Sequence, residues 1–175
     1  SLVPPIINKN KIFIIYKSFI TSHELPSGKL IWKKKLNGAR VWSGVSFDET
    51  ENTIIFVTSN LVDLLGDTNI ENDYSNSLVL LDALSGKTKC KFKDTIHDHW
   101  DLDMVGNPIV KKSDNNTVVY GFSKTGNTFV VDVKTCELLN KDSINRLNVD
   151  SNSPIEGQTY SDYQIKVKNP FNLME

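Results

Sequence analysis

The chain has 175 residues, of which 39% are hydrophobic and 23% charged, and its net charge is −1 at pH 7. This length suffices for a domain with a buried core, and the balanced charge gives no indication of a nucleic-acid partner. No apolar run reaches the roughly 20 residues of a membrane-spanning helix. Two cysteines, Cys90 and Cys136, form neither a disulfide framework nor a zinc motif, and their pairing depends on geometry.

Five short runs of β-branched or aromatic residues predict strands along the chain. Their length and composition are typical of β-strands, and their continuous apolarity predicts strands that are covered on both faces. Turns rich in Gly, Asp, Asn and Ser separate them, and no segment predicts a long helix. The expected class is therefore all-β. The five runs are residues 12–15, 54–57, 78–81, 118–120 and 128–131.

A turn motif recurs at the spacing of a repeat protein. Residues 24–29 and 82–87 share an acid, Ser, Gly and Lys in the same order, and residues 132–137 are a weaker third copy. Two apolar runs precede each copy and a short strand follows it. Four strands per repeat are the unit of a β-propeller blade.

The repeat divides the chain into three expected blades, at residues 1–36, 37–94 and 95–140, followed by a connecting segment at 141–175. Three blades do not close a propeller, which typically needs at least four. The chain also begins without Met. We therefore expect it to be a piece of a larger propeller protein.

The segment richest in chemically active side chains is residues 95–103, which holds two His, three Asp and one Trp in nine positions. It lies between two strand-like runs, on the rim of the predicted structure, where a scaffold presents side chains to a ligand. The residues alone leave three interpretations open. They are a metal site with oxygen or imidazole ligands, a carboxylate general base, and a solvated turn with local hydrogen bonds.

Several segments resemble the signatures of the quinoprotein dehydrogenases, which use pyrroloquinoline quinone (PQQ), and they follow one another along the chain in the order of that family. The turns at 24–29 and 82–87 resemble the propeller repeat of that family, and His97 to Asp103 resembles its His-Asp-x-Trp-Asp signature. Three further segments are similar to the parts that carry a ring-stacking Trp, a metal-ligand Asn and a cation beside the quinone. They are residues 38–44, 57–60 and 123–127.

The resemblance implies an eight-bladed propeller that oxidises an alcohol or a sugar hydroxyl in the periplasm, either free or associated with the membrane. A quinone or a cytochrome would accept the electrons. Asp101 would take the hydroxyl proton while hydride moves to the cofactor. Trp42 would lie flat against the cofactor ring, and Lys124 would place positive charge beside the quinone oxygens. Asn60 would ligate a metal ion through its amide oxygen.

Asp103 is expected to be a second metal ligand, because an acid two positions after the catalytic Asp resembles the extra ligand of lanthanide-dependent methanol dehydrogenases. Sugar dehydrogenases of the family carry the same pattern without a lanthanide. The expected metal is therefore calcium or magnesium, with a lanthanide as the alternative. His97 and His99 are expected to shape the loop rather than to bind metal.

The chain also departs from the family pattern. The carboxylate metal ligand and the group that covers the second face of the cofactor lie upstream of the region present here, so the isolated piece is expected to be inactive. Cys90 stands where the repeat usually has Trp, and Cys136 where it usually has Gly. We expect these two substitutions to weaken two contacts between blades.

A second function competes with the enzyme: a non-catalytic propeller scaffold of the outer-membrane assembly type, which shares the repeat. Such a scaffold has no reason to keep the four site residues together. A third interpretation, a generic calcium-binding β-domain, leaves Trp42 and Lys124 unexplained. The four residues in question are Trp42, Asn60, Asp101 and Lys124.

Overall fold

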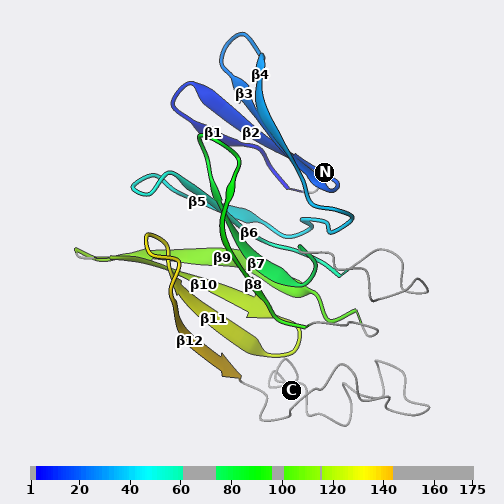
Figure 1. The fold of residues 1–175 in the computed structure, drawn as a ribbon, viewed down its shortest axis with the longest axis vertical. Helices are drawn as coiled ribbons and strands as arrows, with labels where there is room; N and C mark the ends of the chain where they lie inside the picture. Colours follow the sequence, from blue (N-terminus) through cyan, green and yellow to red (C-terminus); the bar gives the residue numbers. More distant parts are fainter. Residues whose placement is uncertain (1–2, 61–73, 96–100, 115, 144–175) are drawn as a thin grey trace, which may run out of the picture.

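The computed structural model describes residues 3–60, 74–95, 101–114 and 116–143. They form three four-stranded antiparallel sheets, which follow one another along the molecule in chain order (Figure 1). Within these ranges there is no helix, and hence none that is long and apolar enough to cross a membrane. The predicted all-β class is confirmed.

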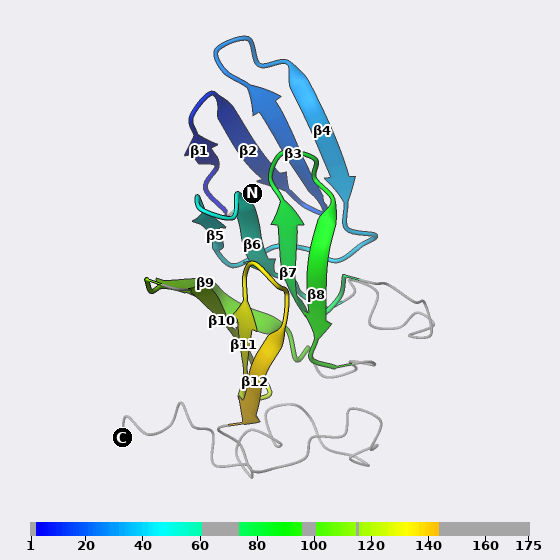
Figure 2. The same cartoon turned by 60° about the vertical axis from the view of Figure 1, so that its left-hand side comes forward.

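Each sheet is a meander in which consecutive strands pair, as in a propeller blade (Figure 2). Blade 1 contains β1 (Ile6–Asn8), β2 (Lys11–Tyr16), β3 (Phe19–Glu24) and β4 (Leu30–Lys35). Blade 2 contains β5 (Val45–Asp48), β6 (Thr53–Val57), β7 (Ser77–Asp82) and β8 (Thr88–Lys93). Blade 3 contains β9 (Met104–Lys112), β10 (Thr117–Ser123), β11 (Asn127–Asp132) and β12 (Leu138–Ser143). The last strand thus runs to Ser143, past the blade boundary expected at residue 140, and residues 144–175 lie outside the described part.

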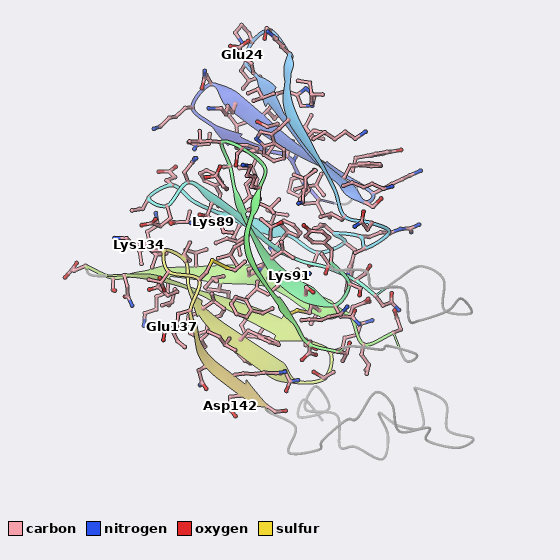
Figure 3. All side chains as sticks on the ribbon, in the orientation of Figure 1. Glu24, Lys89, Lys91, Lys134, Glu137 and Asp142 are labelled. Carbon is pink, nitrogen blue, oxygen red and sulfur yellow. A yellow bond between two sulfur atoms is a disulfide. The ribbon has the colours of Figure 1, made fainter. Side chains whose placement is uncertain are left out.

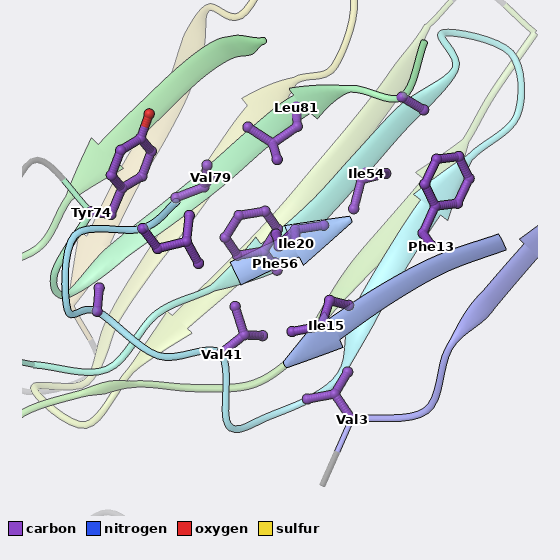
Figure 4. Packing of buried hydrophobic residues seen from close by; sticks show 13 residues of the cluster. Val3, Phe13, Ile15, Ile20, Val41, Ile54, Phe56, Tyr74, Val79 and Leu81 are labelled. Atoms are coloured by element: carbon purple, nitrogen blue, oxygen red, sulfur yellow. The ribbon is translucent and has the colours of Figure 1, made fainter. Parts of the chain in front are cut away.

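Blade 2 is covered on both faces. Successive side chains of a strand point to opposite faces of its sheet, so β6 divides its apolar residues between two cores. Ile54 and Phe56 join the core shared with blade 1 (Figure 4), whereas Ile55 and Val57 join the core shared with blade 3. All four side chains are fully buried. The prediction of doubly covered strands is confirmed here.

Blade 1 has only one face covered by the described chain. On β2, Phe13 and Ile15 are buried against blade 2, whereas Ile14 and Tyr16 are 40% and 54% exposed on the opposite face. The continuous apolar run therefore predicted the strand β2 correctly. Of the three blades, however, only the middle one has strands that are covered on both faces by the described chain.

The three repeat turns have the same backbone geometry. In each, the residue at the glycine position donates its N–H to the carbonyl of the acid four positions earlier, at 2.8 to 2.9 Å. That residue has a positive φ of 71° at Gly28, 70° at Gly86 and 60° at Cys136. Glycine adopts this left-handed conformation without cost, whereas Cys136 carries a side chain there.

Blades 1 and 2 are joined by a tryptophan lying on a glycine. A Cβ atom built at Gly86 would lie 2.6 Å from Cε3 of Trp32, so the indole fits only because that residue has no side chain. The Trp32 Nε1–H donates to the carbonyl of Ala83 at 3.1 Å. This contact supplies both apolar packing and a hydrogen bond to the turn of the next blade.

Blades 2 and 3 are joined at the equivalent positions by a disulfide between Cys90 and Cys136, whose Cα atoms are 5.9 Å apart. Figure 3 labels neighbours of both cysteines, with Lys89 on β8 and Lys134 on the facing turn. The ammonium of Lys89 donates to the carbonyl of Val133 at 3.2 Å. The weakened contact that we expected from the two substitutions is thus replaced by a covalent one.

Candidate functional site

The segments that carry the predicted site residues meet at one end of blades 2 and 3. In an antiparallel meander, the segment before the first strand and the segment after the second lie at the same end of the sheet. Trp42 precedes β5 and Asn60 follows β6; Asp103 and Asp101 precede β9 and Lys124 follows β10. The strand order therefore brings together residues that are up to 82 positions apart in the sequence.

Lys124 is the centre of the cluster. Its Nζ lies 3.0 Å from Oδ2 of Asp101, 2.8 Å from the Asp101 carbonyl and 2.9 Å from Oδ2 of Asp103. It also lies 5.6 Å from the centroid of the Trp42 ring, within the range of a cation–π contact. Its side chain is only 23% exposed. This is a fixed ammonium group and not a solvated turn lysine.

Asp103 holds the two blades of the site together. Its Oδ1 accepts the backbone N–H of Asn60 at 2.7 Å, and its Oδ2 accepts Lys124. The carboxylate is buried. Burial raises the pKa of Asp103, because the hydrogen bonds from Lys124 and Asn60 oppose desolvation without cancelling it and the charge of Asp101 adds to it.

The ammonium of Lys124 stays charged in this setting. Burial alone would lower the pKa of Lys124, but the hydrogen bonds to Asp103 and Asp101 outweigh burial and raise it. Two carboxylates share this one cation. The site therefore presents a permanent positive charge next to two acids of unequal exposure.

Asp101 lies at the open side of the cluster. Its side chain is 57% exposed, and its backbone has a positive φ of 58°. Asp and Asn tolerate this conformation better than most residues. The turn leaves the carboxylate accessible to a small molecule while Lys124 fixes its position.

Trp42 and Asn60 complete the cluster in different ways. Trp42 is 40% exposed, so its ring offers a face to a ligand and is not part of either core. Asn60 is 9% exposed, and its buried Nδ2 has no hydrogen-bond partner among the described residues. A buried polar atom of this kind is costly unless another group satisfies it.

The residues present fit a metal-bound quinone only in part. Asn60 offers an amide oxygen of the kind that binds hard cations, whereas its unpaired nitrogen is a donor that needs an acceptor. Both oxygens of Asp103 already accept protein donors. Within the described residues no three His, Cys, Asp or Glu side chains cluster as a metal centre. Metal ligation by Asn60 and Asp103 thus stays a prediction.

The first four of the five positions of the His-Asp-x-Trp-Asp signature, residues 97–100, lie outside the described part of the chain. The expectation that His97 and His99 shape the loop falls on those residues. Asp94, which sequence reasoning did not single out, contacts the turn that carries Lys124. The available signal was the pair of hydroxyl residues, Ser123 and Thr125, on either side of the lysine.

The sequence comparisons with known proteins agree on one family. A family model described as the glucose/ethanol/alcohol dehydrogenase β-propeller domain matches residues 20–172. Quinoprotein glucose dehydrogenase A of Acinetobacter calcoaceticus is 31% identical over 55% of the chain. Quinate/shikimate dehydrogenase (quinone) of Acinetobacter baylyi is 30% identical over 74%. The chain spans 13% and 17% of the lengths of these two relatives.

Solved structures share the fold at low sequence identity. Quinohemoprotein alcohol dehydrogenase from Comamonas testosteroni matches with a TM-score of 0.65 and 18% identity, covering 81% of this chain and 28% of its own. A europium-containing methanol dehydrogenase matches with a TM-score of 0.66 and 16% identity, covering 82% of this chain and 34% of its own. BamB from Moraxella catarrhalis matches with a TM-score of 0.54 and 17% identity, covering 82% of this chain and 37% of its own.

Proposed function

Because the chain belongs to the β-propeller family of PQQ-dependent dehydrogenases, we propose that it supplies part of the active site of an enzyme that oxidises an alcohol or a sugar hydroxyl. The whole enzyme would be longer, since the chain spans less than a fifth of its curated relatives. Its small-molecule substrate and its electron acceptor, a quinone or a cytochrome, are proposed on the likeness to that family.

One observation carries the proposal: Lys124 contacts both Asp101 and Trp42 at the rim, and Asp103 joins Lys124 to Asn60. Fold stability does not require an exposed indole, a partly buried ammonium and an accessible carboxylate at one spot. Charged groups are desolvated there at a cost that a scaffold would avoid. A redox site for an uncharged hydroxyl substrate makes use of all three.

The chemistry assigned to each residue follows from its setting. Asp101, accessible and oriented, would take the proton of the substrate hydroxyl as hydride leaves the neighbouring carbon. Lys124 would supply positive charge where negative charge develops during the reaction. Trp42 would pack its exposed ring face against a flat cofactor. PQQ, when bound with its metal ion, would accept the hydride.

The metal ion is assigned to the Asn60 side chain, with calcium, magnesium or a lanthanide as candidates. Oxygen ligands suit all of these hard cations. Asp103 could join as a second ligand only by sharing its oxygens with Lys124 and the Asn60 backbone. We therefore propose that its main part is to orient Lys124, and that the remaining ligands come from outside the described residues.

The periplasm is the proposed location. The Cys90–Cys136 disulfide supports it, because disulfides persist in oxidising compartments and are rare in the cytosol. The family resemblance points to the same compartment.

A non-catalytic scaffold is the second candidate, favoured by the structural match to BamB. It shares the blade architecture but gives no account of the Lys124 cluster. The two functions differ in a simple measurement, since a scaffold has no PQQ-dependent turnover.

The test is turnover of the intact protein with an artificial electron acceptor, at saturating PQQ and metal. Asp101→Asn keeps the shape and the acceptor oxygen but cannot take a proton at neutral pH. It should lower kcat by about 10²–10⁴-fold. Asp98→Asn is the control and should cost far less, because we interpret Asp98, in the same motif, as a residue that shapes the loop. Absence of PQQ-dependent turnover in the parent would favour the scaffold; a dead Asp98→Asn with an active Asp101→Asn would move the base to Asp98.

A further inference from the structure

We propose that Asp94, in blade 2, is the positioning residue for Lys124, in blade 3. The inference rests on the function proposed above and adds a residue to it. Within the described part of the chain, Asp94 forms no hydrogen bond or ion pair with Asp101 or Trp42. It acts through the turn between β10 and β11, residues 123–127.

The carboxylate of Asp94 accepts hydrogen bonds from three side chains of this turn. Its Oδ2 accepts the hydroxyls of Ser123 and Thr125, the latter at 2.7 Å, and its Oδ1 accepts Nδ2 of Asn127 at 2.6 Å. Lys141 adds a looser ion pair at 3.5 Å. The Asp94 side chain is fully buried, so all of its acceptor capacity is directed at blade 3.

Lys124 lies between two of these three residues. Ser123 and Thr125 also contact each other through their hydroxyls at 2.8 Å, and the backbone N–H of Lys124 donates to the Asp103 carbonyl at 3.0 Å. The lysine backbone is thus held from both sides, and its ammonium is directed at the two acids. A side chain with four rotatable bonds would otherwise lose much of its order.

The anchor itself is rigid. The backbone N–H of Asp94 donates to the carbonyl of Asn76, and Nδ2 of Asn76 donates to the hydroxyl of Thr95 at 2.6 Å. Asp94 also directly precedes the segment that leads to Asp101 and Asp103. One buried carboxylate therefore sets the distance between the blade that carries Asn60 and the turn that carries Lys124.

The chain contains a matched control for a purely structural role. Asp48 is also fully buried, accepts a turn N–H, from Glu51 at 2.9 Å, and pairs with a blade 3 lysine, Lys112, at 3.1 Å. It lies at the opposite end of blade 2, because it pairs with Thr53 at the start of β6 whereas Asn60 follows the end of that strand. Losing either buried carboxylate removes a bridge between blades 2 and 3.

The first measurement is kcat of the intact protein, loaded with PQQ and calcium, for Asp94→Ala, Asp48→Ala, Lys124→Met and the Asp94→Ala/Lys124→Met double variant. Misplacing a catalytic group by about 1 Å costs about 100-fold in rate, which is the loss expected of Asp94→Ala. Asp48→Ala should turn over like the parent. In the Lys124→Met background, adding Asp94→Ala should lower kcat by less than about a further twofold. Additive losses would show that Asp94 acts independently of Lys124 and would overturn the inference.

The second measurement does not depend on activity. Lysines of the unloaded protein are labelled with a trace of acetic anhydride, and the modification of Lys124 is quantified by mass spectrometry. Asp94→Ala should raise the labelling of Lys124 about threefold or more, while Asp48→Ala should not. Unchanged labelling in a folded Asp94→Ala variant would overturn the inference, whether or not the parent turns over. A parent without PQQ-dependent turnover contradicts the proposed function alone.

Discussion

The two junctions between blades solve the same packing problem with different chemistry. Between blades 1 and 2, the ring of Trp32 covers Gly86 and its N–H reaches the carbonyl of Ala83. Between blades 2 and 3, the Cys90–Cys136 disulfide takes the place of ring and glycine, and Lys89 supplies the donor to the equivalent carbonyl.

The difference between the two junctions shows that their side chains can be exchanged while the backbone of the turn stays the same. The turn backbone is the same at both junctions, including the positive φ. Only the side chains that bridge the gap differ, and they differ as a pair. The covalent version joins the two blades that share the Lys124 cluster, where relative movement would separate Asn60 from Lys124.

Removing the disulfide should have the largest effect on stability. For a sequence separation of 46 residues, the chain-entropy model gives about 4 kcal/mol for the loss of the bridge in Cys90→Ala/Cys136→Ala. The measurement is urea unfolding of the intact protein. Reductant should weaken the parent and leave the double variant unchanged. If reductant weakens both equally, the sensitive bond is not this one.

Substituting Gly86 should come next, because two costs combine there. Gly86→Ala places a methyl group against the ring of Trp32 and a side chain at a φ of 70°, for a total of about 3 kcal/mol. Gly28→Ala is the matched control: its φ is 71°, but nothing lies within 4 Å of the added Cβ. It should cost only about 1 kcal/mol. Equal losses in urea unfolding would mean that the ring does not depend on the glycine.

Exchanging one junction for the other should recover part of the stability lost with the disulfide. Cys90→Trp/Cys136→Gly recreates the tryptophan–glycine contact and should be about 2 kcal/mol more stable than Cys90→Ala/Cys136→Ala. Cys90→Trp alone should gain little, because a side chain remains at residue 136. A single Trp variant as stable as the pair would show that the two positions are independent.

Acid should affect the two junctions alike, and only slightly. Burial acts to raise the pKa of Asp82, but the hydrogen bonds from Ser85 outweigh it; the pKa of Asp132 is lowered mainly by the backbone N–H of Thr135. Because the folded values lie below the unfolded value of about 3.9, this stability is fully present above about pH 5 and is lost as the pH falls through the folded values.

Asp132→Asn tests this pH dependence, since the amide keeps an acceptor oxygen but does not titrate. Its urea midpoint should be slightly below that of the parent at pH 7 and should meet it in strong acid. A variant that follows the parent in parallel across the whole range would show that Asp132 contributes nothing to the acid response.

The sequence predicted the blades because each blade repeats a local pattern. The apolar runs at residues 54–57 and 78–81 became β6 and β7, and the repeated turn residues became turns of one geometry. Antiparallel pairing brings the segments of Trp42, Asn60 and Lys124 to one end of the sheets, because each residue lies beside the end of a strand.

The contacts between blades could not be predicted from local sequence patterns. The disulfide depends on the stagger of blade 3 against blade 2, which no run of residues encodes. The same holds for Asp94, which reaches a turn 29 to 33 positions away. Asp103 stays a predicted metal ligand, and the structure adds the backbone N–H of Asn60 and the ammonium of Lys124 as donors to its two oxygens. Sequence pattern identified the acid but not its donors.

The replacement of a Trp–Gly pair by Cys90 and Cys136 also has a consequence for how the two positions change in evolution. A lineage that changed the glycine first would have carried a strained side chain at a φ of 60° with no compensating bond. One that changed the tryptophan first would have lost the ring contact and gained an unpaired thiol. Because each single step should be less stable than either end state, we expect the two changes to occur together. Relatives that descend from this branch should have both cysteines, and relatives outside it neither.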